Sequence, residues 1–190
     1  AVLQQDRQVL ILVPEINLTP QLEKGFRDRF PALSVICLHS KLNTTERTQN
    51  WLLAQAGTAN IVLGTRLSIF TPLPKLGLII VDEEHDPSYK QQDGFRYSAR
   101  DVAIFRAKQT GVPIVLGSAT PSLESYHNAL TGRYALLTLR TRAIKNAALP
   151  VIQLIDTRNK LLQEGLSEPL LNALEQNLVQ NKQSMVFINR

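Results

Sequence analysis

Cysteine is almost absent from this 190-residue sequence, and Cys37 stands alone inside the apolar run 34–38. A single cysteine allows no intrachain disulfide and no zinc site built from cysteine pairs. A thiol within an apolar run is typical of a buried core, and we interpret Cys37 in this way. Sparse cysteine also suits a reducing compartment, so we expect a cytoplasmic protein.

Long apolar runs are also missing. The longest, 76–81, contains a glycine and is followed at once by three acids, whereas a membrane span needs roughly 20 apolar residues. Residues 1–8 lack the basic start, apolar stretch and cleavage site of a secretory signal. We therefore expect no membrane partner. The net charge of +5 is compatible with a polyanionic partner, but charge alone gives this little weight.

A third absence concerns phosphate binding. The pattern Gly-x-x-x-x-Gly-Lys-Ser/Thr does not occur anywhere in the chain. Without it, no lysine is placed on the β- and γ-phosphates of a nucleotide and no hydroxyl on its Mg²⁺. Any nucleotide chemistry in this chain would therefore lack its usual phosphate cradle.

Short apolar runs rich in β-branched residues recur along the chain. Runs that are almost continuously apolar are typical of parallel strands covered on both faces. The predicted strands are 9–13, 34–38, 60–63, 76–81, 113–116, 134–139, 151–155 and 184–188.

Helical patterns lie between these runs. Thr19-Pro20 and the Asn43 to Glu46 spacing are helix starts, and Gly57 is a helix stop. Trp51, within the second helix, is predicted to belong to the core. Strands alternating with helices predict an α/β fold with a parallel sheet and helices on both faces. The predicted helices are 20–30, 43–56, 98–109, 121–130 and 167–182.

The strongest chemical signal is an apolar strand that ends in Asp82, Glu83, Glu84 and His85. Ligands bind at the carboxyl ends of strands in open α/β sheets. There, Asp82 could hold Mg²⁺ through water, and a second carboxylate could accept a proton from an attacking water. We therefore interpret this segment as catalytic, against the alternative of an acidic loop.

A second strand ends in small hydroxyl residues, about 30 residues after the acids. Because parallel strand ends share one edge of a sheet, we expect Ser118 and Thr120 to hydrogen-bond the acids or His85. Thr120 could also cap the following helix, with Pro121 at its first position.

Gly64, Thr65 and Arg66 follow a third strand. Glycine allows the backbone to approach a ligand, and the other two side chains suit phosphate oxygens of a nucleic acid. A strand-end turn with a solvated arginine is the open alternative. Glu15, after the first strand, is expected to have a structural role.

The long polar segment 84–97 interleaves aromatic and cationic residues. Aromatic faces stack on unpaired bases while cations meet phosphates, which favours DNA contact over simple anchoring of the loop. The predicted contacts are Tyr89, Lys90, Phe95, Arg96 and Tyr97.

Together these segments resemble superfamily-two helicases of the Asp-Glu-x-His type, and among them the bacterial replication-restart helicases called primosomal protein N-prime. The resemblance runs over nearly the whole chain. Its motifs are Leu12 to Glu15, Leu18 to Gln21, Leu38 to Ser40, Glu46-Arg47, Trp51, Gly64 to Arg66, Asp82 to Asp86, Ser88 to Gln91, Arg96-Tyr97, Ala99 to Asp101, Gly117 to Glu124 and Phe187 to Arg190.

The resemblance implies ATP-driven 3′-to-5′ unwinding of DNA at stalled or repaired forks, with ATP and Mg²⁺ as cofactors. It implies Asp82 as the Mg²⁺ residue, Glu83 as general base, and His85, Ser118 and Thr120 as coupling groups. The implied partners are single-stranded and forked DNA, primosome proteins and single-strand-binding proteins. The family's zinc-binding cysteines are not in this chain.

We predict a RecA-like P-loop NTPase domain over 1–140, a linker at 141–150 and the start of a second RecA-like domain at 151–190. The P-loop strand is expected just before Ala1. Its absence should open a central gap and leave two strand edges unpaired, and the chain alone should hydrolyse little or no ATP. A restriction-type translocase and an inactive remnant that only binds DNA or partner proteins stay open.

Overall fold

The computed structural model describes residues 1–15, 17–141, 150–159 and 161–188, in two compact units, Ala1–Leu137 and Thr138–Arg190. The predicted linker at 141–150 falls mostly outside these described ranges, as do the last two residues of the chain. Each unit is considered by itself.

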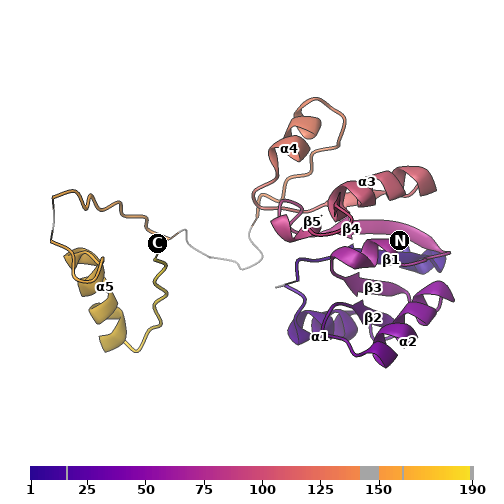
Figure 1. Ribbon diagram of the computed structural model, residues 1–190, viewed down its shortest axis with the longest axis horizontal. Helices are drawn as coiled ribbons and strands as arrows, with labels where there is room; N and C mark the ends of the chain where they lie inside the picture. Colours follow the sequence, from indigo (N-terminus) through magenta and orange to yellow (C-terminus); the bar gives the residue numbers. More distant parts are fainter. Residues whose placement is uncertain (16, 142–149, 160, 189–190) are drawn as a thin grey trace. The chain divides into compact units, whose positions relative to one another are not determined.

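A five-stranded parallel sheet organises the first unit (Figure 1), in the order β2-β3-β1-β4-β7. This confirms the α/β class with a parallel sheet. The expected central gap is wrong, because β1 pairs directly with β3 on one side and with β4 on the other. The strands are β1 (Gln8–Leu12), β2 (Val35–Leu38), β3 (Ile61–Gly64), β4 (Leu76–Val81) and β7 (Ile114–Leu116).

Helices cover both faces of this sheet. Helix α1 (Pro20–Arg29) packs Leu22 and Phe26 on one face, against a buried cluster that includes Cys37. Helices α2 (Thr44–Gln55) and α3 (Ala99–Thr110) place alanines on the opposite face. Small residues allow close approach of helix and sheet. The two apolar clusters therefore fix which strand ends meet at one edge.

Local capping explains where these helices begin and end. The Thr19 hydroxyl accepts from the Leu22 amide at 3.2 Å, and Asn43 and Glu46 form a reciprocal capping box. Helix α3 ends at Gly111, whose φ of 65° lies in the left-handed region that glycine favours. These starts and stops agree with the sequence patterns.

Helix α4 (Leu123–Leu130) begins later than predicted. Its cap is Ser122, whose hydroxyl accepts from the Ser125 amide at 3.3 Å. The interpretation of Thr120 as a cap with Pro121 at the first helical position is therefore wrong. Thr120 is free for the other predicted role, a contact with the acid segment.

The second unit contains helix α5 (Glu168–Val179), shorter than the predicted 167–182. The predicted strands 134–139, 151–155 and 184–188 are not strands. An apolar run reports a tendency to be buried, but a strand also needs a neighbour for its backbone groups. In the part of the chain that the structure describes, no helix is long and apolar enough to cross a membrane.

Of the two residues predicted to lie in the core, Cys37 is buried and Trp51 is not. Cys37 is buried, and burial, with the nearby Glu23 carboxylate, raises the pKa of its thiol to about 12, so the inert core interpretation is confirmed. Trp51 is 37% exposed and lines a pocket, so its prediction as core is wrong. The indole faces that pocket from α2.

The backbone at Gly64 is crowded by its own chain. A Cβ at this position would overlap the Ser68 side chain and lie 3.1 Å from the Leu38 carbonyl oxygen. Ser68, in the short helix Arg66–Phe70, in turn donates to that same carbonyl at 2.9 Å. Glycine therefore serves close packing between β3, β2 and this turn, and not the predicted approach of a ligand.

We expect Gly64→Ala to lower the free energy of unfolding by about 1–3 kcal/mol, as overpacking typically does. Gly25→Ala is the matched control, since a Cβ there meets nothing within 4 Å in helix α1. That change should raise stability by roughly 0.5–1 kcal/mol. Urea denaturation measures both, and equal stability of the two variants would contradict the packing role of Gly64.

Candidate functional site

The acidic segment turns sharply away from the carboxyl end of β4. Glu83 has a φ of 46°, a left-handed conformation that costs a non-glycine residue roughly 1–2 kcal/mol. Three hydrogen bonds hold the turn: Glu83 N to Asp82 Oδ1 at 3.1 Å, Glu84 N to Gly117 O at 3.0 Å and Asp86 N to Glu83 O at 2.8 Å. Strain maintained in this way is typical of functional sites.

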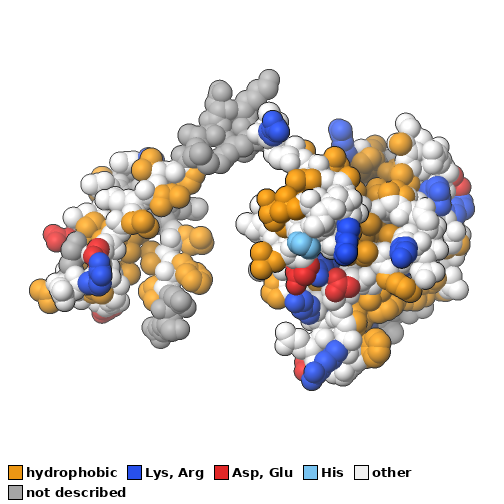
Figure 2. Space-filling view, turned by 90° about the horizontal axis from the view of Figure 1, so that it is seen from above, with side chains coloured by type: hydrophobic (Ala, Val, Ile, Leu, Met, Phe, Trp, Pro, Cys, Tyr) orange, Lys and Arg blue, Asp and Glu red, His pale blue; other side chains and the backbone are white. Residues whose placement is uncertain are grey.

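His85 joins the acidic segment to the segment after β7. Its Nδ1 lies 2.7 Å from Ser118 Oγ, and its Nε2 lies 3.3 Å from Thr120 Oγ1. The same Nδ1 lies 3.6 Å from Glu83 Oε2. Figure 2 shows a histidine bordered by acidic side chains on the first unit. The structure thus brings together the five residues that the sequence placed at this edge.

Glu84 is a buried carboxylate that sequence reasoning did not assign to the site. It accepts from the Ser122 amide at 2.6 Å, the Ser125 hydroxyl at 2.9 Å and Arg100 Nη1 at 3.2 Å. These donors come from α3 and from the start of α4, so Glu84 binds β4 to both helices. The available signal was a third acid beside two others, which sequence alone does not distinguish from a solvated one.

The charge state of Glu84 follows from these contacts. Burial alone would raise the pKa of this carboxyl. The hydrogen bonds from the Ser122 amide and from Ser125, Ser122 and Arg100 outweigh burial and hold its pKa below the ordinary value. Glu84 is therefore ionised when it binds the two helices.

Tyr89 is buried, and its hydroxyl donates to the Asp82 carbonyl oxygen at 2.6 Å. Burial, and then the charges of Asp82, Asp86 and Glu83, raise the pKa of the Tyr89 hydroxyl, so it stays protonated as a donor. The predicted stacking of Tyr89 on DNA is therefore wrong, because its ring is not accessible.

Arg66 does not extend toward solvent. Its Nη1 donates to the Ser88 carbonyl at 3.0 Å and to the Lys90 carbonyl at 3.3 Å. Thr65 is also nearly buried. The predicted phosphate contact of Arg66 is therefore replaced by a bond to the aromatic segment, which it ties to the end of β3.

The aromatic segment is a short hairpin, not the long loop predicted. Strands β5 (Lys90–Gln91) and β6 (Tyr97–Ser98) pair antiparallel. Phe95 is 81% exposed, and its ring lies 6.1 Å from that of Tyr97, which packs edge-on against Phe70 at 5.1 Å. Lys90 and Arg96 are exposed. Of the five predicted contacts, these two cations and Phe95 have accessible side chains, and Tyr97 is half-buried.

Mg²⁺ and ATP differ in how well the residues of this chain suit them. Among the described residues, no group of three or more His, Cys, Asp or Glu side chains could hold a metal. Mg²⁺, however, is often bound through one or two carboxylates and retained waters, and the exposed Asp82 carboxylate suits that mode. The ATP phosphates find no cradle in this sequence, because the glycine-lysine loop does not occur.

Comparison with known proteins shows the family to which this chain belongs. The family model described as DEAD/DEAH box helicase matches residues 1–129. Replication restart protein PriA of Haemophilus influenzae is 47% identical over 100% of this chain and 26% of its own length. The Bacillus subtilis PriA is 41% identical over 100% of this chain and 24% of its own length. The chain thus spans about a quarter of these relatives.

Among solved structures, the C-terminal domain of Dbp5 from S. cerevisiae is similar with a TM-score of 0.45 and 16% sequence identity. The similarity covers 70% of this chain and 75% of that chain.

We expect Glu84→Gln to lower the free energy of unfolding by about 2–3 kcal/mol, because it removes a buried charge that three donors and Arg100 require. Glu124→Gln is the matched control, since this exposed carboxylate lies 3.9 Å from the same Arg100. Its effect should stay within about 0.5 kcal/mol. Chemical denaturation at neutral pH measures both, and similar losses would refute the special role of Glu84.

The pH dependence of stability should carry the same signature. A carboxyl whose pKa is lowered on folding contributes stability above its unfolded pKa and loses it as the pH falls through the folded pKa. The unfolded value is near 4.5, so the stability difference between wild type and Glu84→Gln should shrink progressively below about pH 5. Thermal melts between pH 3 and 7 measure this, and a constant difference would contradict an ionised Glu84.

Proposed function

The chain belongs to the DEAD/DEAH box helicase family, and we propose that it forms part of the motor of an ATP-dependent 3′-to-5′ DNA helicase that acts in replication restart. The observation that carries this proposal is the cluster of Asp82, Glu83, His85, Ser118 and Thr120 at one sheet edge. The similarity to replication restart proteins along the whole chain supports the same function.

The acids have different chemical roles in this proposal. Asp82 holds Mg²⁺ through water, and the ion, when bound with ATP, neutralises charge on the phosphates. Glu83 accepts the proton of the attacking water, and its carboxylate lies beside His85, 3.6 Å from Nδ1. His85 Nδ1 lies near both the Glu83 carboxylate and the Ser118 hydroxyl, and its Nε2 lies near the Thr120 hydroxyl.

A continuous set of contacts connects this site to the aromatic hairpin. Tyr89 donates to the Asp82 carbonyl, and Arg66 donates to the carbonyls on both sides of Tyr89. A displacement of the hairpin would therefore move the backbone that carries the Mg²⁺ residue. We infer that DNA contact and hydrolysis are coupled along this route, with His85, Ser118 and Thr120 as the second connection.

DNA contact in this proposal falls to the accessible groups of the hairpin. Phe95 stacks on an unpaired base, and Lys90 and Arg96 meet phosphates. The Tyr97 ring packs against Phe95, and Arg66 positions the hairpin from the end of β3, where Gly64 and Thr65 are buried. The partners are single-stranded and forked DNA, with primosome and single-strand-binding proteins in the bacterial cytoplasm. Zinc belongs to parts of such a helicase that this sequence does not contain.

We also propose the division of the motor: residues 1–140 form the first RecA-like domain, 141–150 a linker, and 151–190 the beginning of a second RecA-like domain. The alternative function is a catalytically inactive remnant that only binds DNA or partner proteins. The acids, in contrast, would serve a restriction-type translocase equally well.

We expect this chain to bind single-stranded DNA with an affinity that falls as salt rises, since cations on the hairpin release counterions from phosphates. ATP hydrolysis should stay at background with or without DNA. Lys90→Ala and Arg96→Ala should each weaken binding and reduce the salt slope by about one. Fluorescence anisotropy of a labelled oligonucleotide, with phosphate release measured in parallel, tests this.

Glu83→Gln is the control for this experiment, because it should leave DNA binding unchanged. When a phosphate-binding segment is supplied ahead of Ala1, hydrolysis should appear, and Glu83→Gln should then reduce it by roughly 100-fold or more, as loss of a general base does. DNA-stimulated hydrolysis by the chain alone, or hydrolysis that survives Glu83→Gln, would overturn the assignment.

A further inference from the structure

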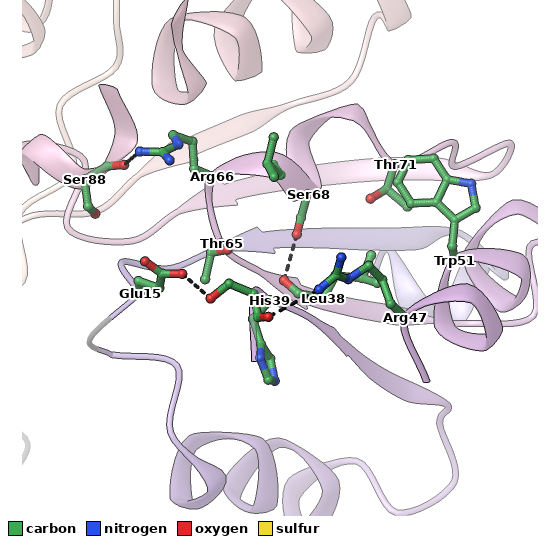
Figure 3. Close-up of a pocket in the computed structure, with 12 residues that line it drawn as sticks. Glu15, Leu38, His39, Arg47, Trp51, Thr65, Arg66, Ser68, Thr71 and Ser88 are labelled. Atoms are coloured by element: carbon green, nitrogen blue, oxygen red, sulfur yellow. Dashed lines mark hydrogen bonds between the residues drawn. The ribbon is translucent and has the colours of Figure 1, made fainter. Parts of the chain in front are cut away.

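A pocket of about 280 Å³ opens beside the hairpin, at the carboxyl ends of β2 and β3 (Figure 3). Its lining is mainly apolar, with Trp51 of α2, Leu38 of β2 and Leu67 of the turn after β3 among the walls. Arg66 and Ser88, which connect the hairpin to β3, line the same space. The pocket therefore adjoins the surface proposed to contact DNA, but it is distinct from the acidic cluster.

Two buried polar atoms of pocket-lining residues have no hydrogen-bond partner within the described ranges. They are the hydroxyl oxygen of Thr71, a residue that is 0% exposed, and Nε of Arg66. Buried polar groups in native proteins nearly always have partners, and each exception requires an explanation. A ligand with polar edges that enters the pocket would supply both missing partners.

Several other polar groups of the pocket form hydrogen bonds within the chain. The Ser40 hydroxyl donates to Glu15 Oε1 at 2.5 Å, Ser68 donates to the Leu38 carbonyl, and Arg47 Nη2 donates to two backbone carbonyls. Glu15 thus has the structural role expected of it. Among the pocket residues, Thr71 and Arg66 are thus the ones whose buried side-chain polar atoms lack a partner within the described part of the chain.

We propose that this pocket takes one nucleobase of single-stranded DNA, an inference that rests on the proposed DNA-binding function. The volume of about 280 Å³ lies just below the usual range of ligand pockets, roughly 300–1,000 Å³, and suits a single ring system. The indole of Trp51 offers a face for stacking. The Thr71 hydroxyl and Arg66 Nε offer polar contacts to the base edge.

Trp51 is the only tryptophan of the chain, so its intrinsic fluorescence reports on this pocket directly. An oligodeoxythymidylate should quench Trp51 on binding, because a base stacks on the indole. An abasic oligonucleotide of equal length keeps the phosphates and should bind through the cations without quenching. Equal quenching by both oligonucleotides would overturn the base pocket.

Variants separate the pocket from the rest of the DNA surface. Thr71→Val keeps the shape of the side chain and should weaken oligodeoxythymidylate binding about 2- to 10-fold, as loss of one hydrogen bond does. Trp51→Ala should weaken it roughly 5-fold or more, as loss of base stacking does. Neither change should affect binding of the abasic oligonucleotide. Thr110→Val and Leu52→Ala are the matched controls, since both residues are exposed and neither lines the pocket.

Further outcomes distinguish the source of the base and the failure of either proposal. Quenching by AMP at concentrations where the oligodeoxythymidylate has no effect would assign the pocket to a free nucleotide and overturn the DNA source. DNA binding that is unchanged by Thr71→Val and Trp51→Ala would refute the base pocket while the proposed function stands. If neither oligonucleotide binds, the DNA-binding function and the base pocket fail together.

Discussion

The buried Glu84 carboxylate holds the functional edge of the sheet together. It lies three residues after the end of β4 and binds the start of α4 and the guanidinium of Arg100 on α3. Because Asp82 and His85 lie within two residues of it, the same bonds fix the acids relative to Ser118 and Thr120. A neutral or exposed side chain at this position would leave two helices and the turn at Glu83 without a common anchor.

The hairpin beside this edge is fixed from two directions. The buried Tyr89 hydroxyl donates a hydrogen bond to the Asp82 carbonyl. Arg66, at the end of β3, donates hydrogen bonds to the carbonyls of Ser88 and Lys90. The aromatic ring and the guanidinium that make these internal contacts would also suit DNA. Because they are turned toward the interior of the domain, they serve internal hydrogen bonding and not DNA contact. The side chains of Lys90, Phe95 and Arg96 are exposed and remain available to a partner.

Sequence patterns predicted the five strands of the sheet, the capped starts of α1, α2 and α3, and the gathering of His85 with Ser118 and Thr120. These features depend on local propensity and on the general rule that parallel strand ends share one edge. The pattern did not reveal the partners of Glu84, Tyr89 and Arg66, which come from segments 7 to 41 residues away in sequence. The apolar runs 134–139, 151–155 and 184–188 were wrongly predicted as strands for a related reason. Composition does not show whether a neighbouring strand is present to pair with them.

The order of strands in the sheet also bears on how the chain acquires its structure. Strand β1 is fully buried, yet Val9 pairs with Ile61 on one side and Leu78 on the other. During synthesis from the N-terminus, this apolar segment appears before either neighbour and must wait for both. Pairing over such separations is slow, and an exposed strand in the meantime is prone to aggregate. The element at the centre of the finished domain is thus the one most in need of protection while the chain is being made.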